Sequence, residues 1–115
     1  MRHWRPKQPC VYILASKPRG AMYVGMSCFL HDRILTHKQE LNAGYTRAFG
    51  VHRLVYYEML ELIPEAIQRE TRLKKWHRPW KFRLIEEMNP EWIDLHDEAS
   101  GQILDGPADI ARLRH

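Results

Sequence analysis

The chain has 115 residues, of which 44% are hydrophobic, and its formal net charge is +4 at neutral pH. This length suits one domain with one core, and no apolar run approaches the roughly 20 residues that a helix needs to span a bilayer. No apolar signal core follows the basic N-terminus, so we expect a cytoplasmic protein with no membrane partner. The two cysteines, Cys10 and Cys28, lie far apart and outside zinc-ligand spacing, which predicts reduced thiols and no structural zinc.

A β-hairpin is predicted near the start of the chain, after a basic, proline-containing irregular arm over residues 1–9. Residues 10–14 are strand formers, residues 16–20 supply a turn, and residues 21–25 return as a second strand. The loop can hold three to five residues, so the register of the pair stays open.

Each strand of this hairpin carries one tyrosine. Side chains alternate along a strand, so Tyr12 and Tyr23 lie side by side if their faces coincide. Gly25 shares a face with Tyr23 and is interpreted as leaving room for the backbone of a ligand. The alternative is that the two tyrosines only pack one face of the hairpin.

A helix is predicted from Ser27 to Leu41, with Ser27 as its N-cap. Its apolar residues repeat at helical spacing, and Arg33 and His37 fall on or beside the apolar stripe. These two residues are four apart, so their side chains stack on one edge of the helix. For His37 alone, the alternative is a hydrogen-bonded histidine of the core.

The remaining core elements follow in order. A third strand is predicted over residues 53–58, a helix over residues 63–77, and another helix from Trp80 to Glu87 after Pro79. Trp92, Ile93 and Leu95 are expected to pack against the core.

The acidic end of the chain, residues 97–115, contains two glycines and a proline and has little apolar period. We therefore predict a loosely attached C-terminal tail and a core domain over residues 10–96.

Glu70 is an unusual residue in the helix over residues 63–77, because Ala66, Ile67 and Leu73 form the predicted inward stripe and Glu70 lies within it. An isolated buried carboxylate costs several kcal/mol or more, so it must pair or bind a cation. A salt bridge to Arg33 would pair the carboxylate and would give Glu70 a purely structural role. A divalent metal ion, most naturally Mg²⁺, would pair it and would give Glu70 a catalytic role.

Together, these five ionisable side chains indicate phosphodiester hydrolysis. Glu70 would hold the metal ion, which polarises a phosphoryl oxygen, and the planar fork of Arg33 suits a phosphate oxygen. A tyrosine near these cations would lose its proton more easily and activate water as a general base. His37 would relay that proton or bind the phosphate.

A basic block precedes an acidic one in the second half of the chain. Residues 66–85 hold seven Lys/Arg and one acid, whereas residues 86–109 hold eight acids and no Lys or Arg. The basic block predicts a phosphate-binding surface or, alternatively, a solvated helix face. The candidate nucleic-acid contacts, including one arginine from the loop before the third strand, are Arg47, Arg69, Arg72, Lys74, Lys75 and Arg78.

These residues resemble the GIY-YIG nuclease superfamily, in its small single-domain bacterial type. The likeness covers roughly residues 9–95, and the order and spacing of several separate motifs make it specific. The matching pieces are Val11-Tyr12-Ile13, Tyr23-Val24-Gly25, Arg33 with His37, residues 54–58, residues 65–76 with Glu70, and Asn89-Pro90-Glu91-Trp92.

The resemblance implies an α+β fold, with a small three-stranded antiparallel sheet flanked by helices. It also implies cleavage of DNA with Mg²⁺ or Mn²⁺ and no organic cofactor, with branched or damaged DNA in repair as a candidate substrate. Glu70 would be the metal ligand, Arg33 would contact the scissile phosphate, and Asn89 would support the site. Tyr12 and Tyr23 would flank the attacking water, with Tyr12 preferred as the base.

The chain departs from the family pattern at several positions. Cys10 and Val11 replace the glycine and isoleucine of the first motif, and Met26 stands where some relatives carry lysine. His37 takes the place of a tyrosine found in the excision-repair incision relatives, so proton handling is expected to differ. The alternative function is a non-catalytic nucleic-acid-binding module that uses residues 66–85, with Trp76 or Trp80 stacking on bases.

Overall fold

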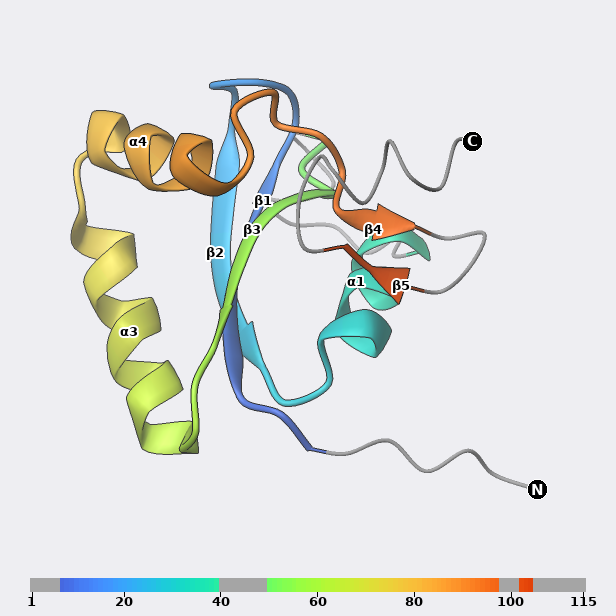
Figure 1. Ribbon diagram of the computed structural model, residues 1–115, viewed down its shortest axis with the longest axis vertical. Coiled ribbons are helices and arrows are strands. Elements are labelled where there is room, and N and C mark those ends of the chain that lie inside the picture. Colours follow the sequence, from blue (N-terminus) through green and yellow to red (C-terminus); the bar gives the residue numbers. More distant parts are fainter. Residues whose placement is uncertain (1–6, 40–49, 98–101, 105–115) are drawn as a thin grey trace.

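The computed structural model describes residues 7–39, 50–97 and 102–104. The predictions for Arg47, for the last residues of the first helix and for most of the C-terminal tail lie outside these residues. The described residues form an α+β domain built on an antiparallel sheet (Figure 1).

The sheet has three strands in the order β2-β1-β3, with β2 over Met22–Ser27, β1 over Cys10–Ala15 and β3 over Arg53–Met59. Every side chain of β1 is fully buried, because β1 is the central strand and helices or loops cover both of its faces. This burial explains why β1 reads as an uninterrupted apolar and aromatic run. The predicted three-stranded antiparallel sheet is confirmed.

The hairpin between β1 and β2 settles the register that the sequence left open. Tyr12 pairs with Gly25 and Leu14 pairs with Tyr23, so both tyrosines project from one face of the sheet. A backbone hydrogen bond of 3.0 Å from Ser16 N to Ala21 O closes the turn. The prediction of two neighbouring phenols is therefore correct.

Helices cover the two faces of the sheet unequally. Helix α1 (Leu30–Gln39) packs on the face of Tyr12, whereas α3 (Ile63–Lys75) and α4 (Arg78–Met88) pack on the other face (Figure 1). The predicted N-cap at Ser27 is wrong. Ser27 is the last residue of β2 and pairs with Cys10, and its Oγ accepts a hydrogen bond of 3.0 Å from the Phe29 amide just before α1 begins.

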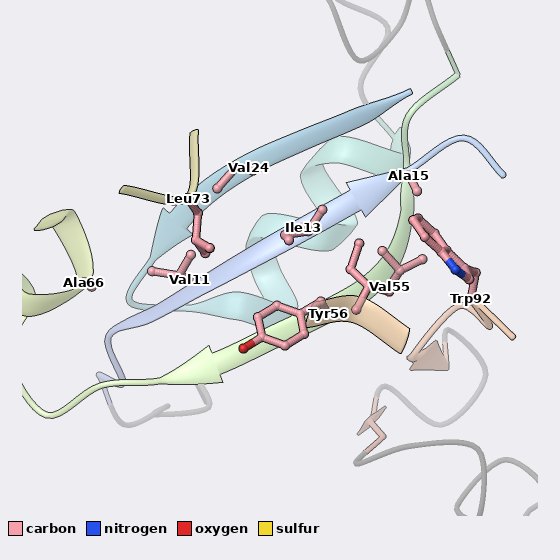
Figure 2. Packing of buried hydrophobic residues seen from close by; sticks show 10 residues of the cluster. Val11, Ile13, Ala15, Val24, Val55, Tyr56, Ala66, Leu73 and Trp92 are labelled. Atoms are coloured by element: carbon pink, nitrogen blue, oxygen red, sulfur yellow. The ribbon is translucent and has the colours of Figure 1, made fainter. Parts of the chain in front are cut away.

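The hydrophobic core has two parts, one on each face of the sheet. Figure 2 shows the part beneath α3 and α4, in which Val11, Ile13 and Leu73 are fully buried. The prediction that Ile67 belongs to the inward stripe of α3 is wrong, because 49% of Ile67 is exposed. Ala66 and Leu73 alone are the buried residues of that helix.

The end of the chain contributes a small second sheet that the sequence did not predict. Strands β4 (His96–Asp97) and β5 (Gln102–Ile103) pair antiparallel and lie on the α1 side of the main sheet (Figure 1). Leu104 is buried, and its carbonyl accepts a hydrogen bond of 3.0 Å from the Tyr57 hydroxyl. Residues 103 and 104, which belong to the stretch 97–115 expected to be loosely attached, are thus docked on the core.

Candidate active site

The centre of the candidate site is the phenol of Tyr12, which projects from β1 toward α1. Its hydroxyl lies 3.1 Å from His37 Nε2 and accepts a hydrogen bond of 3.4 Å from Arg33 Nε. Arg33 and His37 are one turn apart on α1, so their side chains reach the same phenol. Both residues thus lie on the edge of α1 that faces β1.

Burial raises the pKa of Tyr12 to about 12, although the hydrogen bond from Arg33 acts in the opposite direction. Tyr12 is therefore protonated at neutral pH, and its own proton needs an acceptor. Arg33 can only donate, so His37 Nε2 is the atom in reach that can accept this proton. The hydrogen bond to Tyr12 in turn raises the pKa of Arg33, which keeps the guanidinium charged.

Tyr23 lies next to this group on the edge strand β2. Its ring centroid is 6.4 Å from that of Tyr12 and 5.3 Å from that of His37. Tyr23 also contributes to the raised pKa of Arg33. Unlike Tyr12, which is fully buried, Tyr23 is half-buried, so it is the phenol of the pair that solvent reaches.

Gly25 has a different role from the one predicted. A Cβ atom at this position would lie 2.6 Å from the Tyr12 hydroxyl oxygen and 3.0 Å from a ring carbon of Tyr23. The space beside Gly25 is therefore filled by the two phenols and does not admit the backbone of a ligand. Gly25 is needed so that the phenol of Tyr12 can lie flat across β2 and reach His37.

Helix α3, which carries Glu70, packs on the face of the sheet opposite α1 (Figure 1), whereas Tyr12 belongs to the α1 face. Its carboxylate lies 3.3 Å from Nζ of Lys74, and 20% of its side chain is exposed. The alternative salt bridge between Glu70 and Arg33 is not among the ion pairs of the described residues, since Arg33 bonds to Tyr12 instead. Four of the five predicted residues thus form one group, and Glu70 stands apart from it.

The orientation of α3 nevertheless turns Glu70 toward the strand of Tyr23. Arg69 and Glu70 are about 100° apart around the helix and flank the buried line of Ala66 and Leu73 on opposite sides. Arg69 donates to the carboxylate of Glu58, which belongs to β3, at 2.7 and 3.2 Å. Glu70 therefore faces away from β3, toward the free edge of the sheet formed by β2.

The predicted DNA contacts fall into two groups. Arg69 is held by Glu58 and packs its guanidinium 5.2 Å from the centroid of Trp76, and Arg78 donates to the carbonyls of Arg19 and Gly20 in the hairpin turn. The side chains of these two arginines therefore bind other parts of the protein. In contrast, the exposed residues of the basic block that stay at the surface of α3 are Arg72, Lys74 and Lys75.

Asn89 supports the fold at the end of α4. It is fully buried, donates to the carbonyls of Val55 and Ile93, and accepts a hydrogen bond of 3.0 Å from the Ile93 amide. Its amide group is thus used in joining α4 to β3 and to the chain that follows. Both partners of the Asn89 side chain, Val55 and Ile93, lie outside the tyrosine group.

One contact near the site could not be found from sequence spacing. Lys38 follows His37 on α1, and its Nζ lies 2.6 Å from the carboxylate of Asp94, which also accepts a hydrogen bond from the Leu54 amide of β3. This bridge fixes the end of α1 that carries His37 to the sheet. The partner of Lys38 is a single aspartate 56 residues further along the chain, and no local sequence pattern predicts this contact.

Comparison with known proteins shows the family to which this chain is related. A model of the GIY-YIG catalytic domain matches residues 8–83. A UPF0213 protein of Bacillus pumilus is 38% identical over 78 residues, which is 68% of this chain and 80% of the relative. A UPF0213 protein of Clostridium perfringens is 41% identical over 75 residues, which is 65% of this chain and 80% of the relative.

Among solved structures, the solution NMR structure of a UPF0213 protein from Bacillus halodurans is similar, with 31% sequence identity and a TM-score of 0.44. The match covers 70% of this chain and 84% of that chain.

The match to the family model over residues 8–83 defines the class of this small α+β domain. The chain belongs to the GIY-YIG catalytic domain family, and it is similar to the bacterial UPF0213 proteins. The family is one of nucleases. Among the helices of the described part of the chain, none has the length and apolar character required to cross a membrane.

Proposed function

We propose that this protein is an endonuclease that hydrolyses phosphodiester bonds of DNA with the help of a divalent metal ion. The observation that carries the proposal is the Tyr12 hydroxyl, which bonds to Arg33 and His37 at once. A phenol that only packs a core needs one hydrogen-bond partner. A guanidinium, an imidazole and a second phenol around it form an arrangement suited to binding a phosphate and moving a proton.

Arg33 is the proposed phosphate-binding residue. Its Nε is occupied by Tyr12, and its side chain is otherwise exposed, so the guanidinium retains N–H donors for the oxygens of a scissile phosphate. Because the hydrogen bond to Tyr12 raises the pKa of Arg33, the charge persists at every relevant pH. Tyr12 acts here as a positioning residue, since it orients Arg33 and His37 together.

Tyr23 is the tyrosine that we assign to the attacking water. The preference for Tyr12 as the base conflicts with its complete burial and with a pKa of about 12. Tyr23 is half-buried at the edge of the sheet, close to Arg33 and His37. A water molecule bound to Tyr23 would therefore lie beside the phosphate held by Arg33. To act as the base, the Tyr23 hydroxyl would first release its proton to solvent, with the nearby guanidinium of Arg33 stabilising the phenolate. The phenolate would then take a proton from the water as it attacks the phosphorus.

Glu70 is the proposed ligand of a single Mg²⁺ or Mn²⁺ ion. No group of three or more metal-binding side chains occurs in the described ranges 7–39, 50–97 and 102–104. Mg²⁺ commonly uses one or two carboxylates and completes its shell with substrate phosphates and water, so one partly exposed carboxylate is sufficient. The ion pair with Lys74 is a surface pair of small energy, which phosphate and metal can replace. When bound, the ion would stabilise the leaving oxygen.

A nicking assay tests this proposal. The protein should convert supercoiled plasmid to the nicked form with Mg²⁺ or Mn²⁺ and not with EDTA. Glu70→Gln and Arg33→Ala should each reduce the rate at least about 100-fold, as expected for loss of a group that stabilises the transition state. Glu91→Gln, which changes an exposed acid outside the site, should cleave normally. Cleavage that survives Glu70→Gln would contradict the metal assignment.

A second candidate function is a nucleic-acid-binding module without catalysis. The position of Glu70 favours it, because this carboxylate lies on the other face of the sheet and is paired with Lys74. Such a module would bind DNA tightly in a salt-sensitive manner and would not cleave any substrate with any divalent ion. The same nicking assay, run on plasmid and on branched DNA, separates the two functions.

A further inference from the structure

The corner between α3 and α4 contains a cavity that plays no part in the chemistry proposed above. Its volume is about 240 Å³, and it is lined by Trp76, Trp80, Arg83, Leu84 and Glu87. Sites for drug-sized ligands measure roughly 300–1,000 Å³, so this cavity suits a single planar ring system. Its aromatic walls and its charged rim are the features that need an explanation.

The walls are two indole rings. The centroids of Trp76 and Trp80 are 6.2 Å apart and their planes meet at 83°. The guanidinium of Arg69 lies 5.2 Å from the centroid of Trp76, so Trp80 offers the more open ring face. Trp80 is 54% exposed, although it is one of the largest apolar side chains of the protein. An exposed indole beside a partly buried one is a ready stacking surface for a flat ligand.

The rim carries charge of both signs at helical spacing. Arg83 and Leu84 lie three and four residues after Trp80, and Glu87 lies four and three residues after them, so all four form one stripe of α4. A guanidinium at the rim suits a phosphate or the face of a base, and a carboxylate accepts hydrogen bonds from the amino groups of bases. Arg72 and Lys75 on the last turns of α3 add positive charge next to Trp76.

We propose that this cavity binds the base of an unpaired nucleotide. Stacking requires a base that has left the duplex, because the face of a paired base is covered by its neighbours. The inference deepens the proposed nuclease function by naming the substrate class, which is DNA that carries at least one unpaired nucleotide. It rests on that function only in calling the bound strand a substrate. Positive charge around the cavity favours a nucleic-acid strand over an apolar protein segment.

The test compares binding of two single-stranded oligonucleotides in EDTA, one with all its bases and one with a central run of abasic residues. Stacking on one aromatic side chain is worth about 1–3 kcal/mol, so the wild-type protein should prefer the strand with bases by roughly 5- to 150-fold. Trp80→Ala should bind both strands equally and should lose the quenching of tryptophan fluorescence that binding causes. Trp80→Phe should keep part of the preference.

Two controls make the result specific. Phe29→Ala, which removes another large exposed aromatic ring (43% exposed) outside the cavity, should keep the full preference for bases. Circular dichroism and thermal unfolding should show that Trp80→Ala folds like the wild-type protein. An equal preference in Trp80→Ala and wild type, or no preference in wild type, would overturn the base site.

The two proposals fail separately. If the wild-type protein cleaves no DNA but loses its preference for bases in Trp80→Ala, the nuclease function fails and the base site stands. If DNA is cleaved and Trp80→Ala binds and cleaves the strand with bases as wild type does, the base site fails and the nuclease function stands. Binding of an apolar peptide in place of DNA would also overturn the base site.

Discussion

At the scale of single residues, the arrangement depends on a glycine that allows a phenol to cross the neighbouring strand. The hydroxyl of Tyr12 reaches His37 only because Gly25, its partner on β2, has no side chain. The glycine thus sets where the phenol of Tyr12 can lie, and thereby where Arg33 and His37 are held.

Gly25→Ala should therefore weaken both the fold and the site. The added methyl group would meet the Tyr12 oxygen at 2.6 Å and the adjoining ring carbon at 2.7 Å, and overpacking of this kind typically costs about 1–3 kcal/mol. Denaturant unfolding should show this loss. In a Tyr12→Phe background, which removes the closest atom, the cost of Gly25→Ala should be smaller. Equal costs in both backgrounds would contradict the proposed clash.

At the scale of elements, an ion pair between Arg69 and Glu58 joins α3 to the sheet. The sequence pattern had predicted Arg69 to be a DNA contact. The carboxylate of Glu58 accepts hydrogen bonds from Arg69 and from the Tyr56 hydroxyl. Burial, reinforced by Glu58, raises the pKa of Tyr56, which keeps this phenol a donor to the carboxylate. The network orients α3 about its axis, and this orientation turns Glu70 toward β2.

Two arginines on α3 should respond differently to removal. Arg69→Ala should lower the free energy of unfolding by about 1–3 kcal/mol, because it leaves the half-buried Glu58 without its cation. Arg72→Ala, at an exposed position, should change it by less than about 0.5 kcal/mol. Arg72→Ala should have the larger effect on DNA binding, and it should reduce the slope of log binding constant against log salt concentration by about one unit. A reduced slope for Arg69→Ala with unchanged stability would refute this division.

The elements themselves were largely predictable, whereas their tertiary links were not. Alternating and helical periods are local signals, so the three strands of the main sheet and both later helices were predicted within a few residues. The start of α1 was misplaced because Ser27 is a good N-cap by type but is held in β2 by pairing with Cys10. Strands β4 and β5 have two residues each, too few to show a period.

The same distinction holds for the site. Spacing on one helix predicted that Arg33 and His37 act together, and the hairpin predicted the pair of tyrosines. The face from which Glu70 approaches depends on how α3 packs, which no local pattern records. The contact from Arg19 in the hairpin turn to Glu86 of α4, at 2.9 Å, likewise joins residues that are distant in sequence.

At the scale of the whole molecule, the proposed activity needs groups from both sides of a thin sheet to meet at one edge. The phosphate-binding and proton-moving residues lie on the α1 side, and the proposed metal ligand comes from the α3 side (Figure 1). Strand β2 is the edge between them, and it carries Tyr23 and Gly25. A DNA strand that passes along this edge would contact Arg33, the metal ion and the basic end of α3 together.

Relaxation of tyrosine ring signals by Mn²⁺ in NMR spectra is the most direct test of this arrangement. A Mn²⁺ ion held by Glu70 at the β2 edge should broaden the signals of Tyr23 more than those of Tyr56, which lies in the core under α3. The effect should disappear in Glu70→Gln, and Tyr23→Phe and Tyr56→Phe would assign the signals. Broadening of Tyr56 with Tyr23 unaffected would place the ion on the far face of the sheet and would contradict the proposed active site.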